Sequence, residues 1–204
     1  ILRTMKLNAT IDTITARIIA RSAETRSAYL KQMQQARMDG VARSAMSCGN
    51  LAHAYAGCSA HEKGALAENE LKNIGIITSY NDMLSAHKVY EDYPKQIRTY
   101  ATAHNAVAQV AGAVPAMCDG VTQGQAGMEL SLFSRDVIAL AAGVSLSHNT
   151  FDAAVFLGVC DKIVPGLIIA AATFGHLPAV FVPAGPMTSG IANDEKSKVR
   201  NAFA

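Results

Sequence analysis

The chain has 204 residues, of which 50% are apolar and 17% are charged, and its formal net charge is +2. This composition excludes intrinsic disorder, and the length suits one ordinary core of roughly 100–200 residues. Its basic residues are scattered along the chain, so we expect no nucleic-acid partner and no membrane anchor. The longest apolar runs, residues 153–159 and 163–174, are too short for a membrane helix, which needs about 20 residues. A small or acidic ligand is favoured.

A long helix is predicted near the start of the chain. Ile11, Ile14 and Ile18 recur at helical spacing among good helix formers. This spacing predicts an amphipathic helix over residues 10–38, with a solvated arginine-rich face and Gly40 as the stop.

A second, shorter helix is predicted by a capping signal. Ser59 and Glu62 have the spacing of a capping box, in which each side chain binds the backbone amide of the other residue. The helix should continue to about Leu71. We therefore expect a helical segment over residues 1–72.

From residue 73 onward, apolar runs of strand length alternate with helix-like segments. The expected strands cover residues 73–78, 110–117, 153–159 and 179–182, and the expected helices cover residues 94–107, 131–147 and 166–174. Strands that are apolar on both faces and alternate with helices are typical of a parallel sheet between helix layers. The prediction is an α/β fold with a helix-sandwiched, mainly parallel sheet over residues 73–204.

Four segments follow the expected strands. In open α/β sheets, ligands bind beyond the carboxyl ends of the strands. The segments are Thr78–Asp82, Cys118–Gly120, Cys160–Lys162 and Gly185–Gly190. We expect the functional site among them.

Two of these segments place a cysteine directly before an aspartate. The thiolates of Cys118 and Cys160 are soft ligands suited to iron–sulfur chemistry, and the carboxylates of Asp119 and Asp161 suit Mg²⁺ or Mn²⁺. The alternative is that the cysteines pack in the core and the aspartates cap helices. Lys162, directly after a strand, needs Asp119, Asp161 or a bound anion as its partner.

The segment Gly185–Gly190 has two interpretations. Its amides and the hydroxyls of Thr188 and Ser189 suit a phosphate or carboxylate, and a simple turn is the alternative. The four cysteines contain no CxxC pair and are too few for a disulfide scaffold, so they are cytosolic thiols or metal ligands.

Several of these segments resemble the dihydroxy-acid and phosphogluconate dehydratase family. Residues 160–170, CDKIVPGLIIA, are similar to one family signature, and residues 119–135 are similar to another. The phosphogluconate branch also shares the stretches at residues 48–53, 77–85 and 114–120. The resemblance runs from about Arg17 to Ala204.

The resemblance implies an iron–sulfur hydro-lyase that dehydrates 6-phospho-D-gluconate. Cys160 matches a ligand of the [4Fe-4S] cluster. Cys118 is a candidate second thiolate, because it follows a neighbouring strand. Asp119 and Asp161 match ligands of Mg²⁺ or Mn²⁺, and Lys162 matches a carbamylated lysine. The other branch has a cluster cysteine at the position of Tyr80, so one thiolate is missing here. Residues expected to face the substrate are Ser79, Asn81, Thr188 and Ser189.

The resemblance also implies a longer, cytoplasmic, homodimeric protein. A further cluster cysteine, the catalytic base and a C-terminal β-rich domain are expected beyond Ala204. Two alternatives stay open: a dehydratase of another sugar acid or dihydroxy acid, and a non-catalytic α/β module that binds an anion.

Overall fold

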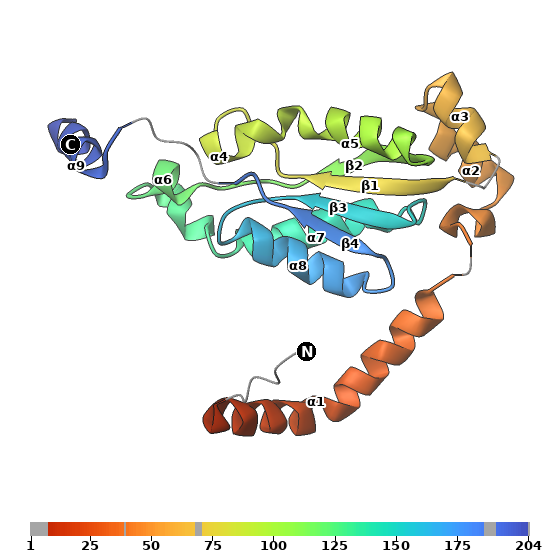
Figure 1. Ribbon diagram of the computed structural model, residues 1–204, viewed down its shortest axis with the longest axis horizontal. Coiled ribbons are helices and arrows are strands. Elements are labelled where there is room, and N and C mark those ends of the chain that lie inside the picture. Colours follow the sequence, from red (N-terminus) through yellow and green to blue (C-terminus); the bar gives the residue numbers. More distant parts are fainter. Residues whose placement is uncertain (1–7, 39, 68–70, 186–190, 204) are drawn as a thin grey trace, which may run out of the picture.

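The computed structural model describes residues 8–38, 40–67, 71–185 and 191–203 of the chain. Its centre is a four-stranded sheet in which all neighbouring strands are parallel (Figure 1). The strands are β1 (Lys72–Thr78), β2 (Ala106–Ala113), β3 (Ala153–Leu157) and β4 (Ala179–Val182). The predicted α/β class with a parallel sheet is confirmed.

Helices cover both faces of this sheet. α5 (Tyr93–Ala103) lies along one face, and α7 (Ser134–Leu146) and α8 (Ile163–Thr173) lie side by side on the other (Figure 1). The strand order is β2-β1-β3-β4, so the chain moves from β1 to one edge and then crosses to the other side of β1. The carboxyl ends of β1 and β3 therefore form the switch point at which open α/β sheets bind ligands.

The central strands are buried on both faces, because successive side chains of a strand point to opposite sides. Ile77 and Phe156 belong to a core cluster that includes residues of α7 and α8. Ile76 and Leu157 belong to a second cluster, which includes Ala101 of α5. This double burial explains the continuous apolar runs in the sequence.

The boundary between α5 and β2 differs from the prediction. The helix expected over residues 94–107 ends at Ala103, and the strand expected over 110–117 starts earlier, as Ala106–Ala113. The chain turns at Asn105, whose φ of 53° lies in the left-handed region that Asn tolerates better than most residues. The apolar pattern runs through this turn without a break, so it gives no sign of the boundary.

The other predicted elements of the sheet domain are confirmed within a few residues, and β4 has the predicted bounds. α7 buries less than its apolar pattern suggests. Ile138 and Ala142 face the core, whereas Leu140 and Val144 are 70% and 67% exposed. Only one side of α7 meets the sheet and α8, so the stripe is wider than the buried face.

Three helices precede the sheet, namely α1 (Ala9–Ala36), α2 (Cys48–Ala56) and α3 (Ala60–Ala67). α1 confirms the predicted long helix, whereas α2 lies where the sequence pattern indicates no element. The remaining elements are η1 (Ala42–Ala45), α4 (Ser85–Lys88), η2 (Val89–Glu91), α6 (Asp119–Thr122), η3 (Ala126–Leu130) and α9 (Asn193–Ala202).

The predicted capping box is confirmed at the start of α3. The Ser59 backbone N–H donates to the Glu62 carboxylate at 2.9 Å, and the Glu62 N–H donates to the Ser59 hydroxyl oxygen at 3.3 Å. The helix ends at Ala67, earlier than the expected end at Leu71.

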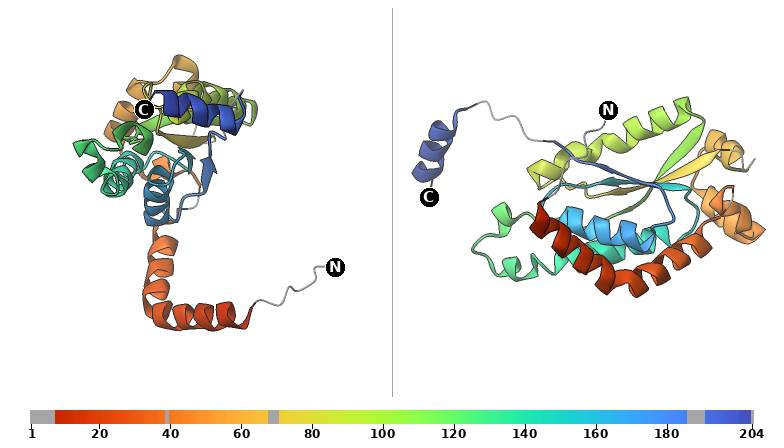
Figure 2. Two further views of the ribbon diagram at one scale, coloured as in Figure 1. Left: turned by 90° about the vertical axis from the view of Figure 1, so that its left-hand side faces the viewer. Right: turned by 60° about the horizontal axis from the view of Figure 1, so that its bottom comes forward.

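α1 projects from the rest of the structure and bends along its length (Figures 1 and 2). None of its residues is buried, so its predicted apolar stripe of isoleucines is not covered within the described ranges. The helix is tied to the sheet domain through Tyr29, whose hydroxyl donates to the carbonyl of Ala172 in α8 at 2.8 Å. No helix in the described part of the chain is both long and apolar enough to cross a membrane.

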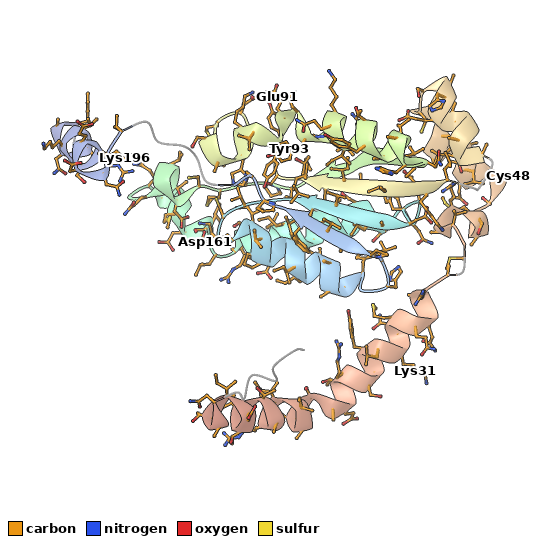
Figure 3. The ribbon with its side chains drawn as sticks, in the orientation of Figure 1. Lys31, Cys48, Glu91, Tyr93, Asp161 and Lys196 are labelled. Carbon is orange, nitrogen blue, oxygen red and sulfur yellow. The ribbon has the colours of Figure 1, made fainter. Side chains whose placement is uncertain are left out.

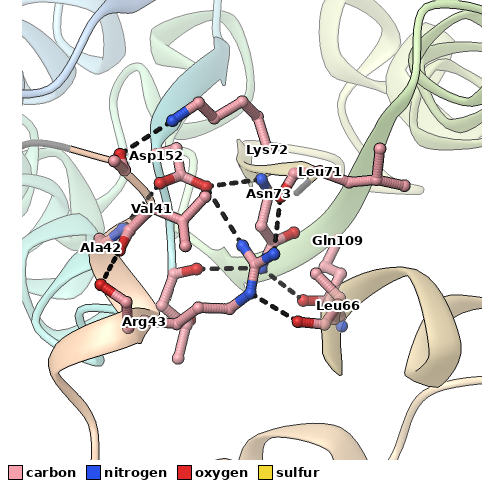
Figure 4. Close-up of polar contacts among 12 residues, drawn as sticks. Val41, Ala42, Arg43, Leu66, Leu71, Lys72, Asn73, Gln109 and Asp152 are labelled. Atoms are coloured by element: carbon pink, nitrogen blue, oxygen red, sulfur yellow. Dashed lines mark hydrogen bonds and ion pairs between the residues drawn. The ribbon is translucent and has the colours of Figure 1, made fainter. Parts of the chain in front are cut away.

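A buried ion pair joins the segment after α1 to the sheet (Figure 4). The side chain of Arg43 is fully buried, and its Nη1 lies 3.4 Å from Oδ2 of Asp152. Arg43 also donates to the carbonyls of Leu66 and Leu71, at 2.9 and 2.7 Å. Asp152 also accepts a 2.8 Å hydrogen bond from the backbone N–H of Asn73 at the start of β1. Such hydrogen bonds are what allow a charge pair to be buried.

Gly166 lets α8 pack closely on α7. A Cβ at this position would lie 2.8 Å from Ile138 and 2.9 Å from the carbonyl oxygen of Arg135. We expect Gly166→Ala to lower the free energy of unfolding by about 1–3 kcal/mol, measured by urea unfolding. Gly143→Ala in α7 is the control, because its nearest contact would be Phe174 at 4.0 Å. Equal midpoints for the two variants would contradict this explanation.

Replacing Arg43 leaves the carboxylate of Asp152 buried without its cation. We expect Arg43→Met to lower the free energy of unfolding by about 3–5 kcal/mol. Lys88→Met is the control, because Lys88 forms exposed ion pairs with Asp82 and Glu91, and such pairs contribute little. If both variants unfold at the same urea concentration, the Arg43 pair does not hold this segment to the sheet.

Candidate functional site

Three of the four predicted loops are described, and each follows a strand at the same edge of the sheet. Thr78–Asp82 follows β1, Cys118–Gly120 follows β2, and Cys160–Lys162 follows β3. Parallel strands direct their carboxyl ends to one edge, which brings these loops together. The fourth segment falls almost wholly outside the described residues, and so do Thr188 and Ser189.

Lys162 is a buried cation at this edge. Its side chain is 3% exposed, and its ammonium forms ion pairs with Asp119 and, at 3.3 Å, with Asp161. Burial disfavours the charged form, but the hydrogen bonds to the two carboxylates outweigh it and raise the pKa of Lys162. Of the alternatives for the partner of Lys162, namely Asp119, Asp161 or a bound anion, the structure shows ion pairs with both aspartates.

Asp119 is held from two sides. Besides Lys162, it accepts a hydrogen bond from the hydroxyl of Ser131 at 2.9 Å. The hydrogen bond from Lys162, followed by that from Ser131, lowers the pKa of Asp119. Ser131 is buried and was missed as a site residue. It lies within the family-like stretch 119–135, which is the signal that points to it.

Cys118 and Cys160 come from neighbouring loops. Burial raises the pKa of the Cys160 thiol, and the nearby Cys118 and Asp161 raise it further. Cys160 also has φ of 80°, in the left-handed region that non-glycine residues rarely adopt. The structure therefore brings two thiols close to the carboxylates that bind Lys162.

The other two cysteines lie elsewhere. Cys48 is exposed and lies at the opposite end of the molecule from Asp161 (Figure 3). Cys58 is buried and accepts a hydrogen bond from the side-chain amide of Gln109 at 3.0 Å. Burial is the main cause of the raised pKa of Cys58, so its position suits packing.

The loop after β1 is organised by its own polar side chains. Ser79 is fully buried, and its N–H and hydroxyl both donate to the carbonyl of Leu157 at 2.9 Å. Asn81 accepts from the N–H of Met83 at 2.8 Å. The hydroxyl of Tyr80 donates to the exposed carboxylate of Asp82 at 2.7 Å. Contact of Ser79 and Asn81 with a substrate stays a prediction.

The donors at this edge fit an iron–sulfur cluster and a divalent cation in type. Iron–sulfur clusters take thiolates, and Mg²⁺ or Mn²⁺ takes carboxylates. Two cysteines and two aspartates supply them here. Across the described residues, no group of three or more His, Cys, Asp or Glu side chains is arranged to hold a metal ion. The donors at this edge are therefore of a suitable type but do not by themselves form a metal site.

Known proteins are similar to this chain over most of its length. Residues 72–204 match the family model described as dihydroxy-acid/6-phosphogluconate dehydratase N-terminal. The phosphogluconate dehydratase of Rhizobium meliloti (strain 1021) is 66% identical over 200 residues, and that of Escherichia coli (strain K12) is 62% identical over 198 residues. These matches cover 98% and 97% of this chain and 33% of each relative.

A more distant relative comes from the other branch. A dihydroxy-acid dehydratase of Carboxydothermus hydrogenoformans is 37% identical over 146 residues, which cover 68% of this chain and 25% of that protein. The chain spans about a third of the length of the phosphogluconate dehydratases it matches. On the family match over residues 72–204, the chain belongs to the dihydroxy-acid/6-phosphogluconate dehydratase family.

Proposed function

We propose that this chain is part of an enzyme that converts 6-phospho-D-gluconate into 2-dehydro-3-deoxy-6-phospho-D-gluconate, a step of the Entner-Doudoroff pathway. The observation that carries the proposal is the ion pair of the buried Lys162 with Asp119, near the thiol of Cys160 at the switch point of the sheet. The relatives named phosphogluconate dehydratase support this choice of substrate.

The reaction needs help at two atoms of the substrate. Hydroxide is a poor leaving group, and the proton beside the carboxylate is weakly acidic, so negative charge must be stabilised at both places. When bound, an iron–sulfur cluster and a divalent cation supply Lewis acids for the leaving hydroxyl and for the carboxylate. The residues of this chain hold those groups and set the surrounding charge.

Cys160 is the proposed cluster ligand in this chain, and Cys118 is the proposed second thiolate. Cys118 lies near enough to Cys160 to raise the pKa of its thiol, which supports the proposal that both thiols bind one cluster. Burial raises the pKa of the Cys160 thiol, so a cluster held by this residue would have to displace the thiol proton. A [4Fe-4S] cluster needs further ligands than these two.

Asp119 and Asp161 are the proposed ligands of Mg²⁺ or Mn²⁺. In this structure the ammonium of Lys162 neutralises them. The raised pKa of Lys162 keeps its amine protonated and so unreactive toward CO₂. We propose that cation binding and carbamylation occur together: the ammonium and CO₂ give a carbamate and release two protons. The carbamate then offers the cation an anionic oxygen.

Other expectations about the whole protein remain proposals. We propose that Asn81 and Ser79, together with Thr188 and Ser189, lie toward the substrate. We also propose a cytoplasmic homodimer, which cell fractionation and size-exclusion chromatography test. The 37% identity to a dihydroxy-acid dehydratase favours, as second candidate, a dehydratase of another sugar acid or dihydroxy acid. Rates on the three substrate classes, measured side by side, decide between them.

Cys160→Ser in the full-length enzyme tests the cluster. We expect the anaerobically purified variant to lose its iron and visible absorbance and to form 2-keto product at least about 100-fold more slowly. Cys48→Ser is the matched control, because Cys48 lies at the far end of the molecule.

Two results would count against the proposal. Unchanged iron and activity in Cys160→Ser would mean that this thiol only packs. A wild-type enzyme without iron and without 2-keto product from 6-phosphogluconate would refute the function and favour the non-catalytic anion-binding module.

Lys162→Arg tests the cation site. Arginine keeps the positive charge beside Asp119 and Asp161 but forms no carbamate under these conditions. We expect the variant to bind Mn²⁺ about 10–100-fold more weakly and to lose the carbamate signal in ¹³C NMR after treatment with labelled bicarbonate. Asp82→Asn, in an exposed ion pair of the neighbouring loop, is the control. Wild-type Mn²⁺ affinity in Lys162→Arg would exclude Lys162 as a ligand.

A further inference from the structure

His87 is a buried histidine with no part in the reaction proposed above. It lies in α4, which follows the loop after β1, and its side chain has no solvent exposure. Its Nδ1 lies 2.9 Å from the hydroxyl oxygen of Ser79, and its ring meets Tyr90 edge-on. Within the described ranges, Nε2 has no hydrogen-bond partner. Burial lowers the pKa of His87, so the ring is neutral at neutral pH.

The hydrogen bonds around Ser79 determine what His87 does. The hydroxyl of Ser79 donates to the carbonyl of Leu157, as does its backbone N–H. Nε2 has no partner among the described residues, so the single proton of the neutral ring is assigned to Nδ1, the nitrogen that has an acceptor. His87 therefore donates from Nδ1 to the Ser79 oxygen. The result is a directed chain of hydrogen bonds from α4 through the end of β1 to the end of β3.

The last acceptor of this series of hydrogen bonds lies directly before one of the loops of the candidate site. Leu157 is the final residue of β3, and the turn that contains Cys160 and Lys162 follows it. The left-handed conformation of Cys160 is unfavourable for a non-glycine residue and persists only where surrounding contacts hold it. On the far side of the turn, the Cys160 carbonyl accepts from the N–H of Val164 at 3.2 Å. On the near side, the Leu157 carbonyl is held by the two hydrogen bonds from Ser79.

We propose that His87 is a positioning residue of the candidate site: through Ser79 it anchors the end of β3 and holds Cys160 in its left-handed turn. The importance of Cys160 rests on the proposed function, whereas the positioning itself can be measured without activity. Without the Nδ1 donor, the Ser79 hydroxyl is free to rotate away from Leu157. The turn then opens more often and exposes the Cys160 thiol.

Cysteine alkylation by iodoacetamide in the metal-free, full-length enzyme tests this, with each site resolved by peptide mass spectrometry. His87→Leu and Ser79→Ala should speed the alkylation of Cys160 by about fivefold, the effect on local opening of losing one neutral hydrogen bond. His87→Asn keeps an N–H donor near the position of Nδ1 and should stay within about twofold of wild type. Cys58 in the same molecules reports general unfolding, because it is buried in a separate cluster.

Three outcomes overturn the proposal: an unchanged Cys160 rate in His87→Leu, an equal increase at Cys58, or a His87→Asn variant that behaves like His87→Leu. Iron content after reconstitution is a second readout, and it should fall in His87→Leu but not in His87→Asn. If wild type lacks dehydratase activity while the alkylation pattern holds, the proposed function fails and the positioning role of His87 stands.

Discussion

The parallel pairing of β1 with β3 is the constraint on which the candidate site depends. In this pairing Thr78 lies opposite Leu157, so the loops that leave the two strands begin side by side. β2 and β4 lie on the outer sides of this pair, and the crossover helices cover opposite faces of the sheet. The switch point is therefore the place where the polar loop residues of the two strands meet. The hydrogen-bonded chain through Ser79 bridges the two strand ends at this point.

A comparison of two buried cations, Arg43 and Lys162, shows why one ion pair holds the fold and the other suits chemistry. Arg43 is fully buried, its partner Asp152 is 7% exposed, and two backbone carbonyls accept from its Nε and Nη2. This pair ties the segment after α1 to the start of β1. Lys162 is equally buried, but the side chains of Asp119 and Asp161 are 41% and 79% exposed. Because these two carboxylates reach solvent, they suit the cation site proposed above.

Much of the fold could be predicted because the strands are short apolar runs between polar segments. β4 has its predicted bounds, and the capping box of Ser59 and Glu62 forms as expected. The α5–β2 boundary was wrong because it depends on a left-handed turn at Asn105, which hydrophobic pattern does not encode. Of the site, Lys162 and its carboxylates were predicted from their positions after strands. Ser131 and His87 were not, since a lone hydroxyl or imidazole carries no periodic signal.

By itself, the sequence determined the fold class, the edge of the sheet that holds the polar loops, and the family, because these depend on local composition and contiguous motifs. Only the tertiary structure decided which side chains touch. It paired Lys162 with Asp119, brought Cys118 near enough to Cys160 to raise its pKa, and linked His87 through Ser79 to Leu157 by hydrogen bonds. These contacts join residues from different loops, and their geometry follows from strand register and helix packing. Neither register nor packing can be read from one segment at a time.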